Sequence, residues 1–111
     1  MQYVLLIYEN EKRWAKGYDK SELAEYQAFG KEFAQQIKGG KALQPTAAAT
    51  TVRIKEGKRL VTDGPFAETK EHLSGFYLVD AKSAEEAAHI ASKIPAARFG
   101  STEVRPIMKF D

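Results

Sequence analysis

The architecture of this chain can be worked out from residues 2–8, QYVLLIY. The run is short, rich in β-branched and aromatic residues and followed by the polar ENEKR, which predicts a β-strand. Alternate side chains of a strand point to opposite faces, and here both sets are apolar: Tyr3, Leu5 and Ile7 on one face, and Val4, Leu6 and Tyr8 on the other. The strand therefore belongs to a sheet that needs cover on both faces.

Further strands are predicted towards the C-terminus. HLSGFYLVD, residues 72–80, repeats the two-sided pattern, with one apolar set on each face: Leu73, Tyr77 and Val79 against Phe76 and Leu78. TAAATTVRI (46–54) and RLVT (59–62) flank the turn sequence KEGK and predict a hairpin. TEVRPIMKF (102–110) predicts the last strand, and Pro106 favours an edge position or a bulge for it.

Two helices are predicted between these strands. The first begins at a capping-box pattern, Asp19 with Glu22, and ends at the glycines 39 and 40, which gives about five turns. Its apolar positions recur at helical spacing: Leu23, Tyr26, Gly30, Phe33 and Ile37. The second helix begins at Ser83 with Glu86, has a face of mostly small residues and ends before Pro95.

This order predicts an α+β fold, a ferredoxin-like βαββαβ pattern with an extra hairpin strand, in one domain over residues 1–111. Both helices would cover one face of an antiparallel sheet. Because two helices cannot cover two faces, we expect the uncovered face to meet a second copy of the chain. The expected assembly is a homodimer through the open sheet face, with a barrel-like interior.

Composition excludes several functional classes. With no cysteine, the chain has neither disulfides nor thiolate metal sites, which fits a reducing cytoplasm. No apolar run is long enough for a membrane span, and no basic segment precedes a leader-like run. The net charge of +2 is spread without a basic stripe, so no nucleic-acid ligand is expected. The one aromatic and basic cluster, KRWAKGY at 12–18, is interpreted as an exposed turn rather than a binding patch.

The stretch VTDGPFAETKEHLSGFYLVD, residues 61–80, resembles the DGPF-domain, YCII-related proteins, and the similarity extends over nearly the whole chain. The resemblance implies a dimeric α+β barrel that binds small organic molecules in a cleft between sheet and helices. It also implies an association with alternative sigma factors, which gives a second hypothesis: a non-catalytic regulatory partner. Relatives have a proposed His-Asp pair with the histidine on the first helix. That helix has no histidine here, so the resemblance carries over only Asp63.

Candidate site residues lie in and around this motif. Asp63 is either the general base at the cleft or simply the residue that forms the Asp63-Gly64-Pro65 turn. The charged loop after it is either a solvated surface or a polar mouth, in which Lys70 binds an anion and Glu68 or His72 transfers protons. Further candidate ligand contacts are Arg53, Pro65, Phe66 and Tyr77.

No cofactor and no metal are expected. The two histidines, His72 and His89, lack the spacing that places two ligands on one helix face, and the glycines 39 and 40 follow a helix rather than opening one. The leading hypothesis is a small polar or anionic organic ligand held near the DGPF loop, with acid–base chemistry through Asp63. Whether the protein is an enzyme stays open at this point.

Overall fold

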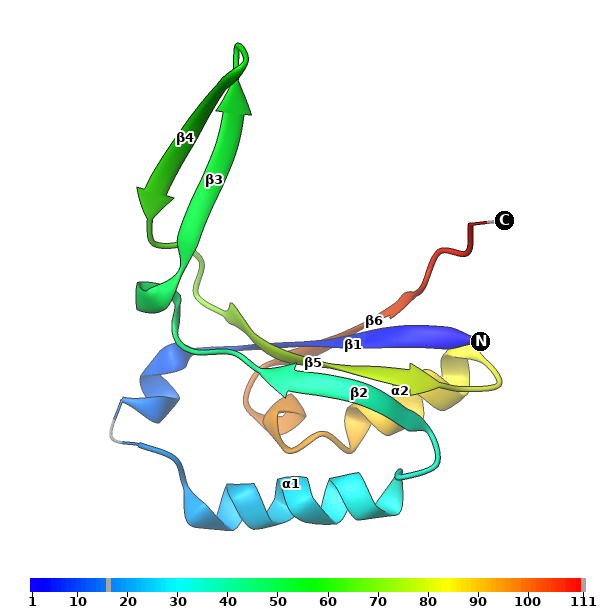
Figure 1. Ribbon diagram of the computed structural model, residues 1–111. Coiled ribbons are helices and arrows are strands. Elements are labelled where there is room, and N and C mark those ends of the chain that lie inside the picture. The colour runs from blue at the N-terminus through cyan, green and yellow to red at the C-terminus, as the bar shows by residue number, and fades with distance from the viewer. Residues whose placement is uncertain (16, 111) are drawn as a thin grey trace.

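The computed structural model describes residues 1–15 and 17–110, which form six strands, two α-helices and three short 3-10 helices (Figure 1). The strands are β1 (Gln2–Glu9), β2 (Ile37–Ala42), β3 (Thr50–Lys55), β4 (Lys58–Asp63), β5 (His72–Asp80) and β6 (Ser101–Pro106). The α-helices are α1 (Lys20–Glu32) and α2 (Ala84–Ser92), and the 3-10 helices are η1 (Glu11–Trp14), η2 (Thr46–Ala48) and η3 (Pro95–Arg98).

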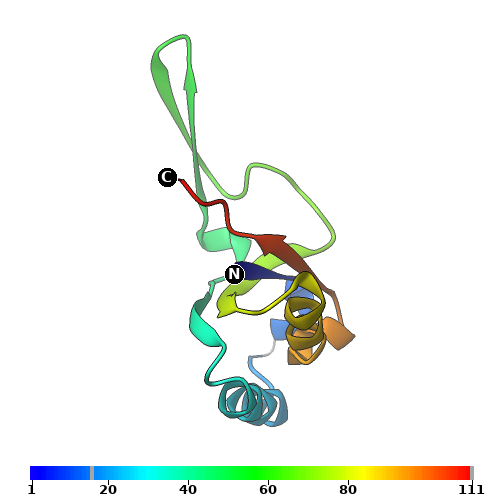
Figure 2. The ribbon, with the colours of Figure 1, turned by 90° about the vertical axis from the view of Figure 1, so that its right-hand side faces the viewer.

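Four strands form the main sheet in the order β2-β5-β1-β6, and every neighbouring pair is antiparallel. With α1 between β1 and β2, and α2 between β5 and β6, this is the predicted ferredoxin-like arrangement. Both helices lie on one face of the sheet, as Figures 1 and 2 show. Pro106 ends the edge strand β6, which confirms the position that this proline predicted.

The core forms between this face and the helices. The buried face of β1 carries Tyr3, Leu5 and Ile7, as its alternation predicted. Val79 from β5 and Ile90 from α2 pack in the same cluster. The predicted caps are also present, because the side chains of Asp19 and Ser83 accept hydrogen bonds from backbone N–H groups in the first turns of α1 and α2.

The prediction for the second strand was wrong. The main sheet takes residues 37–42 as β2, which the sequence had assigned to the end of a helix and its glycine stop. Helix α1 ends at Glu32, well short of five turns. The glycines serve close packing instead, because a Cβ on Gly40 would lie 2.6 Å from the carbonyl oxygen of Phe76 on β5. The predicted 46–54 strand becomes η2 followed by β3.

Two predicted faces also need correction. The buried stripe of α1 holds Glu22 and Phe29, and Phe33 continues it just after the helix, whereas the predicted Leu23 is 44% exposed. On β5 a register shift opposite Ile7 and Tyr8 pairs Leu73 with Tyr8, so Leu73 lies on the open face and not beside Tyr77. A single irregularity in the strand reverses the direction of every side chain beyond it.

The hairpin is separate from the main sheet. Strands β3 and β4 pair with each other in a two-stranded sheet, which we call the arm (residues 50–63). Figures 1 and 2 show the arm projecting from the side of the sheet opposite the helices, and the C-terminal residues leave on that same side. The open face beneath it carries the second apolar set of β1 and its cross-strand neighbours on β5: Val4, Leu6, Tyr8, Leu73, Phe76 and Leu78. The edge strand β6 adds Ser101, Glu103 and Arg105 to this face.

Candidate functional site

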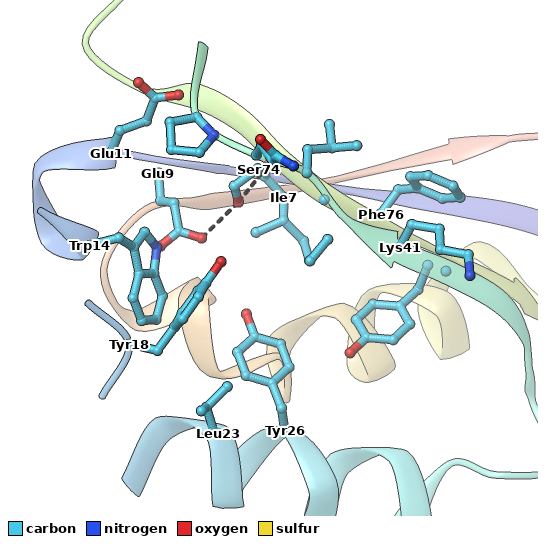
Figure 3. Close-up of a pocket in the computed structure, with 17 residues that line it drawn as sticks. Ile7, Glu9, Glu11, Trp14, Tyr18, Leu23, Tyr26, Lys41, Ser74 and Phe76 are labelled. Atoms are coloured by element: carbon cyan, nitrogen blue, oxygen red, sulfur yellow. Dashed lines mark hydrogen bonds between the residues drawn. The ribbon is translucent and has the colours of Figure 1, made fainter. Parts of the chain in front are cut away.

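A cavity of about 340 Å³ lies between α1 and the sheet, on the helix side (Figure 3). Such a volume is in the range of small-molecule sites. Its walls come from β1, η1, α1, β2 with the residues that follow it, and β5, and most of their lining is apolar or aromatic: Ile7, Trp14, Tyr18, Leu23, Tyr26, Leu43, Pro45 and Tyr77. Several separate parts of the chain therefore meet around one hollow.

Glu9 is the buried charge of this cavity. It is only 3% exposed because β1 continues its core-facing set, Tyr3, Leu5 and Ile7, to this position. One carboxylate oxygen accepts hydrogen bonds from the indole N–H of Trp14, at 3.0 Å, and from Arg13. The other accepts the hydroxyl of Ser74 at 2.7 Å, as Figure 3 shows. Both oxygens are held by fixed donors, so the carboxylate has one orientation.

Arg13 connects Glu9 to a second buried carboxylate. Its guanidinium donates to Glu9 and to Glu22, whose side chains are each only 4% exposed. The guanidinium carbon also lies 4.0 Å from the ring centre of Phe99 and 5.0 Å from that of Trp14. Glu22, expected from the sequence to close a capping box, is thus part of a buried network. Its other oxygen is buried without a hydrogen-bond partner among the described residues.

Two cavity tyrosines remain neutral over a wide pH range. Burial raises the pKa of the Tyr26 hydroxyl far above its usual 10, and the nearby carboxylates of Glu9 and Glu22 raise it further. Burial also raises the pKa of Tyr77, whose ring lies 5.1 Å from that of Phe29. Neutral phenols can both donate and accept hydrogen bonds, so these tyrosines add polar contacts to an otherwise apolar wall.

The mouth of the cavity is held together by Glu11. Its carboxylate accepts the backbone N–H of Thr46 at 2.5 Å and the Thr46 hydroxyl at 2.8 Å, which joins η1 to the start of η2. The Nδ1 atom of His72 lies 3.7 Å from the same carboxylate, at the start of β5. Because Glu11 also lines the cavity, this cluster lies at the edge of the hollow.

The predicted site residues divide into two groups. Tyr77 lines the cavity, and His72 lies beside Glu11 at its edge. The other candidates are exposed and do not line it: Arg53, Asp63, Pro65, Phe66, Glu68 and Lys70. Lys70 instead borders a shallow depression with Tyr8 and Glu103.

Asp63 ends β4 at the base of the arm, opposite Thr50. Gly64 beside it has φ +95°, donates its N–H to the Ala49 carbonyl at 2.7 Å and accepts the Thr51 hydroxyl at 2.7 Å. These contacts form the turn at the base of the arm, just after β4. They agree with the alternative in which the Asp63-Gly64-Pro65 sequence has a structural role. A catalytic role for Asp63 stays a prediction.

Sequence reasoning missed the polar floor of the cavity: Glu9, Arg13, Trp14 and Ser74. One signal was available, because alternation from Tyr3 through Ile7 places residue 9 on the core face, where a carboxylate is unexpected. The cluster at 12–18, interpreted as an exposed turn, supplies Trp14 and Tyr18 to the cavity, while its residue 16 lies outside the described residues. Their position depends on how η1 folds back, which local patterns do not show.

Comparison with known proteins identifies the family. The YCII-related domain matches residues 1–111. The chain belongs to the YCII-related family. An uncharacterised protein of Rhizobium meliloti (strain 1021) is 40% identical in an alignment of 114 positions that covers 96% of this chain and 92% of the relative. The resemblance drawn from the DGPF motif is therefore confirmed.

A solved structure has the same fold as this YCII-related chain. It is the 5-chloro-2-hydroxyhydroquinone dehydrochlorinase TftG from Burkholderia phenoliruptrix AC1100, in complex with 2,5-dihydroxybenzoquinone. The TM-score is 0.61 at 14% sequence identity, and the alignment covers 97% of this chain and 94% of that one. The similarity confirms the α+β, ferredoxin-like fold class over nearly the whole chain.

Proposed function

We propose that this protein binds a small, planar ring compound bearing hydroxyl or carbonyl oxygens in the cavity between α1 and the sheet. The main evidence is that the same cavity is lined by aromatic and by buried polar side chains. Trp14, Tyr26 and Tyr77 form aromatic walls, and Glu9 and Ser74 form a polar floor. Aromatic walls favour a flat ligand, and a few fixed polar groups orient its oxygens.

The floor also has the parts for proton transfer. Ser74 donates its only hydroxyl proton to Glu9, so a ligand hydroxyl in the cavity would meet the acceptor lone pairs of the Ser74 oxygen. When the ligand hydroxyl passes its proton to Ser74, Ser74 passes its own proton to Glu9, and the carboxylate becomes a neutral carboxyl. Tyr26, neutral and near this carboxylate, can donate a hydrogen bond to the oxygen that becomes charged. In this proposal Glu9 has the acid–base role, and the separate prediction of such a role for Asp63 stays untested.

The solved neighbour supports the ligand class. That protein was solved with 2,5-dihydroxybenzoquinone, a flat ring with four oxygens. At this sequence identity the fold alone is shared, so the proposal for this chain rests on its own cavity and not on the neighbour's residues.

Trp14 provides a direct test, because it is the only tryptophan and it lines the cavity. Titration with 2,5-dihydroxybenzoquinone, hydroquinone and hydroxybenzoate, corrected for ligand absorbance, should change its fluorescence in a saturable way. The substitution Tyr26→Phe removes one hydroxyl and should weaken binding by roughly 3- to 10-fold, as expected for one hydrogen bond. Tyr8→Phe makes the same change on the open face and should leave binding unaltered. A linear, unsaturable response to all three compounds would refute the proposal.

We also propose the homodimer through the open sheet face. A folded monomer of 12.4 kDa exposes about 6,100 Å² on the usual size scaling. This chain exposes 8354 Å², an excess of roughly 2,000 Å². The apolar open face around Leu6 and Phe76 would lie against its copy in such a dimer.

The remaining expectations stay predictions of the sequence and the resemblance. They are the regulatory association with alternative sigma factors and the cytoplasmic location. Among the described residues, neither α-helix combines the length and the apolar character that crossing a membrane requires.

A further inference from the structure

The arm is not paired with any other strand in the part of the chain that the structure describes. Among the described residues, β3 and β4 pair only with each other, and an isolated two-stranded hairpin is marginally stable in water. The arm also makes the molecule unusually extended. The radius of gyration is 15.9 Å, against about 13 Å expected for a compact domain of this length. Some surface outside this chain is therefore needed to hold the arm.

The two faces of the arm differ in character. The cross-strand pair Val52 and Val61 lies on one face with Ile54, and these side chains are 56%, 50% and 69% exposed. Arg59, opposite Ile54 near the tip, also lies on this face. The other face carries the cations Arg53, Lys55 and Lys58, with Leu60 opposite Arg53. The face of Val52, Ile54 and Val61, which we call the apolar face, is thus better suited to burial than the face with three cations.

We propose that the arm is the clasp of a homodimer, in which each copy lays the apolar face of its arm against the flank of the other. The proposal rests on the homodimer proposed above and adds a second contact to it. This second contact is made by arm residues that are not part of the open sheet face: Val52, Ile54 and Val61.

The arm is long enough to reach the flank of the second copy. Six residues of strand span about 20 Å, whereas two sheets packed face to face are only about 10 Å apart. The arm rises from the side of the sheet opposite the helices, as Figures 1 and 2 show. The second copy of the proposed homodimer would lie on this side. It must then extend past the plane of the partner's sheet and reach that copy's flank. The two-fold axis repeats the contact, so two arms enclose the dimer.

The available apolar surface is large enough for a stable complex. On this same side of the sheet, the C-terminal residues Ile107, Met108 and Phe110 are 37%, 72% and 86% exposed. Together with the arm, Phe66 and Leu73, they expose on the order of 1,000 Å², whereas a standard interface buries about 800 Å² per partner. A second copy of the chain can supply a matching surface of this size without any other protein.

Sedimentation equilibrium with three variants tests the clasp. Wild type should show twice the chain mass of 12.4 kDa. Val52→Glu places a charge on the apolar face of the arm and should raise the dimer dissociation constant about 100-fold or more. The matched control is Arg53→Glu, which changes the next residue of β3, on the basic face. Its dimer dissociation constant should stay within about threefold of the wild-type value. Leu6→Lys probes the open sheet face, where Glu103 lies opposite as a counter-charge.

The outcomes separate the clasp from the homodimer itself. If Leu6→Lys dissociates the dimer while Val52→Glu does not, the clasp is wrong and the face-to-face dimer stands. A wild type that stays monomeric at all concentrations overturns both. Ile54→Glu repeats the test at a second position on the same face, and unchanged circular dichroism of each variant shows that its body remains folded. Titration of Trp14 with the ring compounds tests the cavity independently of all these results.

Discussion

Removing Arg13 should have a large effect on stability, because its guanidinium pairs with two buried carboxylates, Glu9 and Glu22. Arg13→Met keeps an unbranched side chain at this position but removes the guanidinium, so the contact with the Phe99 ring is lost and Glu9 and Glu22 lose their shared partner. Glu9 retains Trp14 and Ser74, whereas neither oxygen of Glu22 keeps a partner among the described residues. Breaking one side of a buried ion pair costs about 3–5 kcal/mol. For a chain of this size that lowers the melting temperature by roughly 10–20 °C.

Urea unfolding at one fixed protein concentration measures this effect, because dimer formation would otherwise shift the apparent stability. The double variant Arg13→Met/Glu22→Gln is the informative companion. With the unpaired charge at residue 22 removed, it should be more stable than Arg13→Met alone by at least about 1 kcal/mol. A loss below 1 kcal/mol in Arg13→Met would show that water reaches both carboxylates, and the proposed rigid floor of the cavity would be refuted.

Three further predictions concern the cavity wall and α1. In a spectrophotometric titration, Tyr26 and Tyr77 should ionise only above their ordinary pH of about 10, because burial raises the pKa of both hydroxyls. Unfolded chains lose these protons from about pH 10 upwards, so folding stability should fall as pH rises above that value. Phenylalanine at both positions should leave the absorbance change above pH 10 smaller than in the wild type, and an unchanged titration in this region would contradict the prediction. Hydrogen bonds from the first turn of α1 lower the pKa of Asp19 below its ordinary 3.8. The ionised Asp19 therefore contributes to folding stability above about pH 4, and this contribution is lost as pH falls further. Asp19→Asn should therefore reduce the acid sensitivity of urea unfolding between about pH 5 and 3 without removing the cap. Gly40→Ala should destabilise the protein by about 1–3 kcal/mol and weaken ligand binding by displacing Tyr77, whereas Gly39→Ala, with open space around it, should alter neither.

Much of the fold could be predicted because its strongest signals are local. The two-sided apolar pattern of residues 2–8, the caps at Asp19 and Ser83 and the edge proline at 106 each depend on near neighbours in the chain. The second strand could not be predicted in the same way. IKGGKA contains two glycines and two lysines and has low strand propensity. It forms β2 because β5 lies beside it and leaves no room for a side chain at Gly40, which is a tertiary constraint.

The candidate site was predicted only at its edge. The DGPF loop gathers charged residues in sequence, which predicted a site there, but Asp63, Glu68 and Lys70 are exposed and only His72 lies at the edge of the cavity. The cavity gathers its residues in space instead: Glu9 from β1, Arg13 and Trp14 from η1, Tyr26 from α1 and Ser74 from β5. Such a set has no spacing that a sequence pattern could detect.

The two regions are nevertheless joined through Glu11. Its carboxylate lines the cavity and also holds Thr46, from which the chain continues directly into the arm. If the arm is fixed by a second copy, Thr46 is fixed with it, and so is the wall formed by Leu43 and Pro45. A coupling between two sites is reciprocal, so a ligand in the cavity would tighten the dimer by the same factor by which dimerisation tightens the ligand. On this reasoning the DGPF turn influences ligand binding by shaping the arm, without any of its side chains entering the cavity.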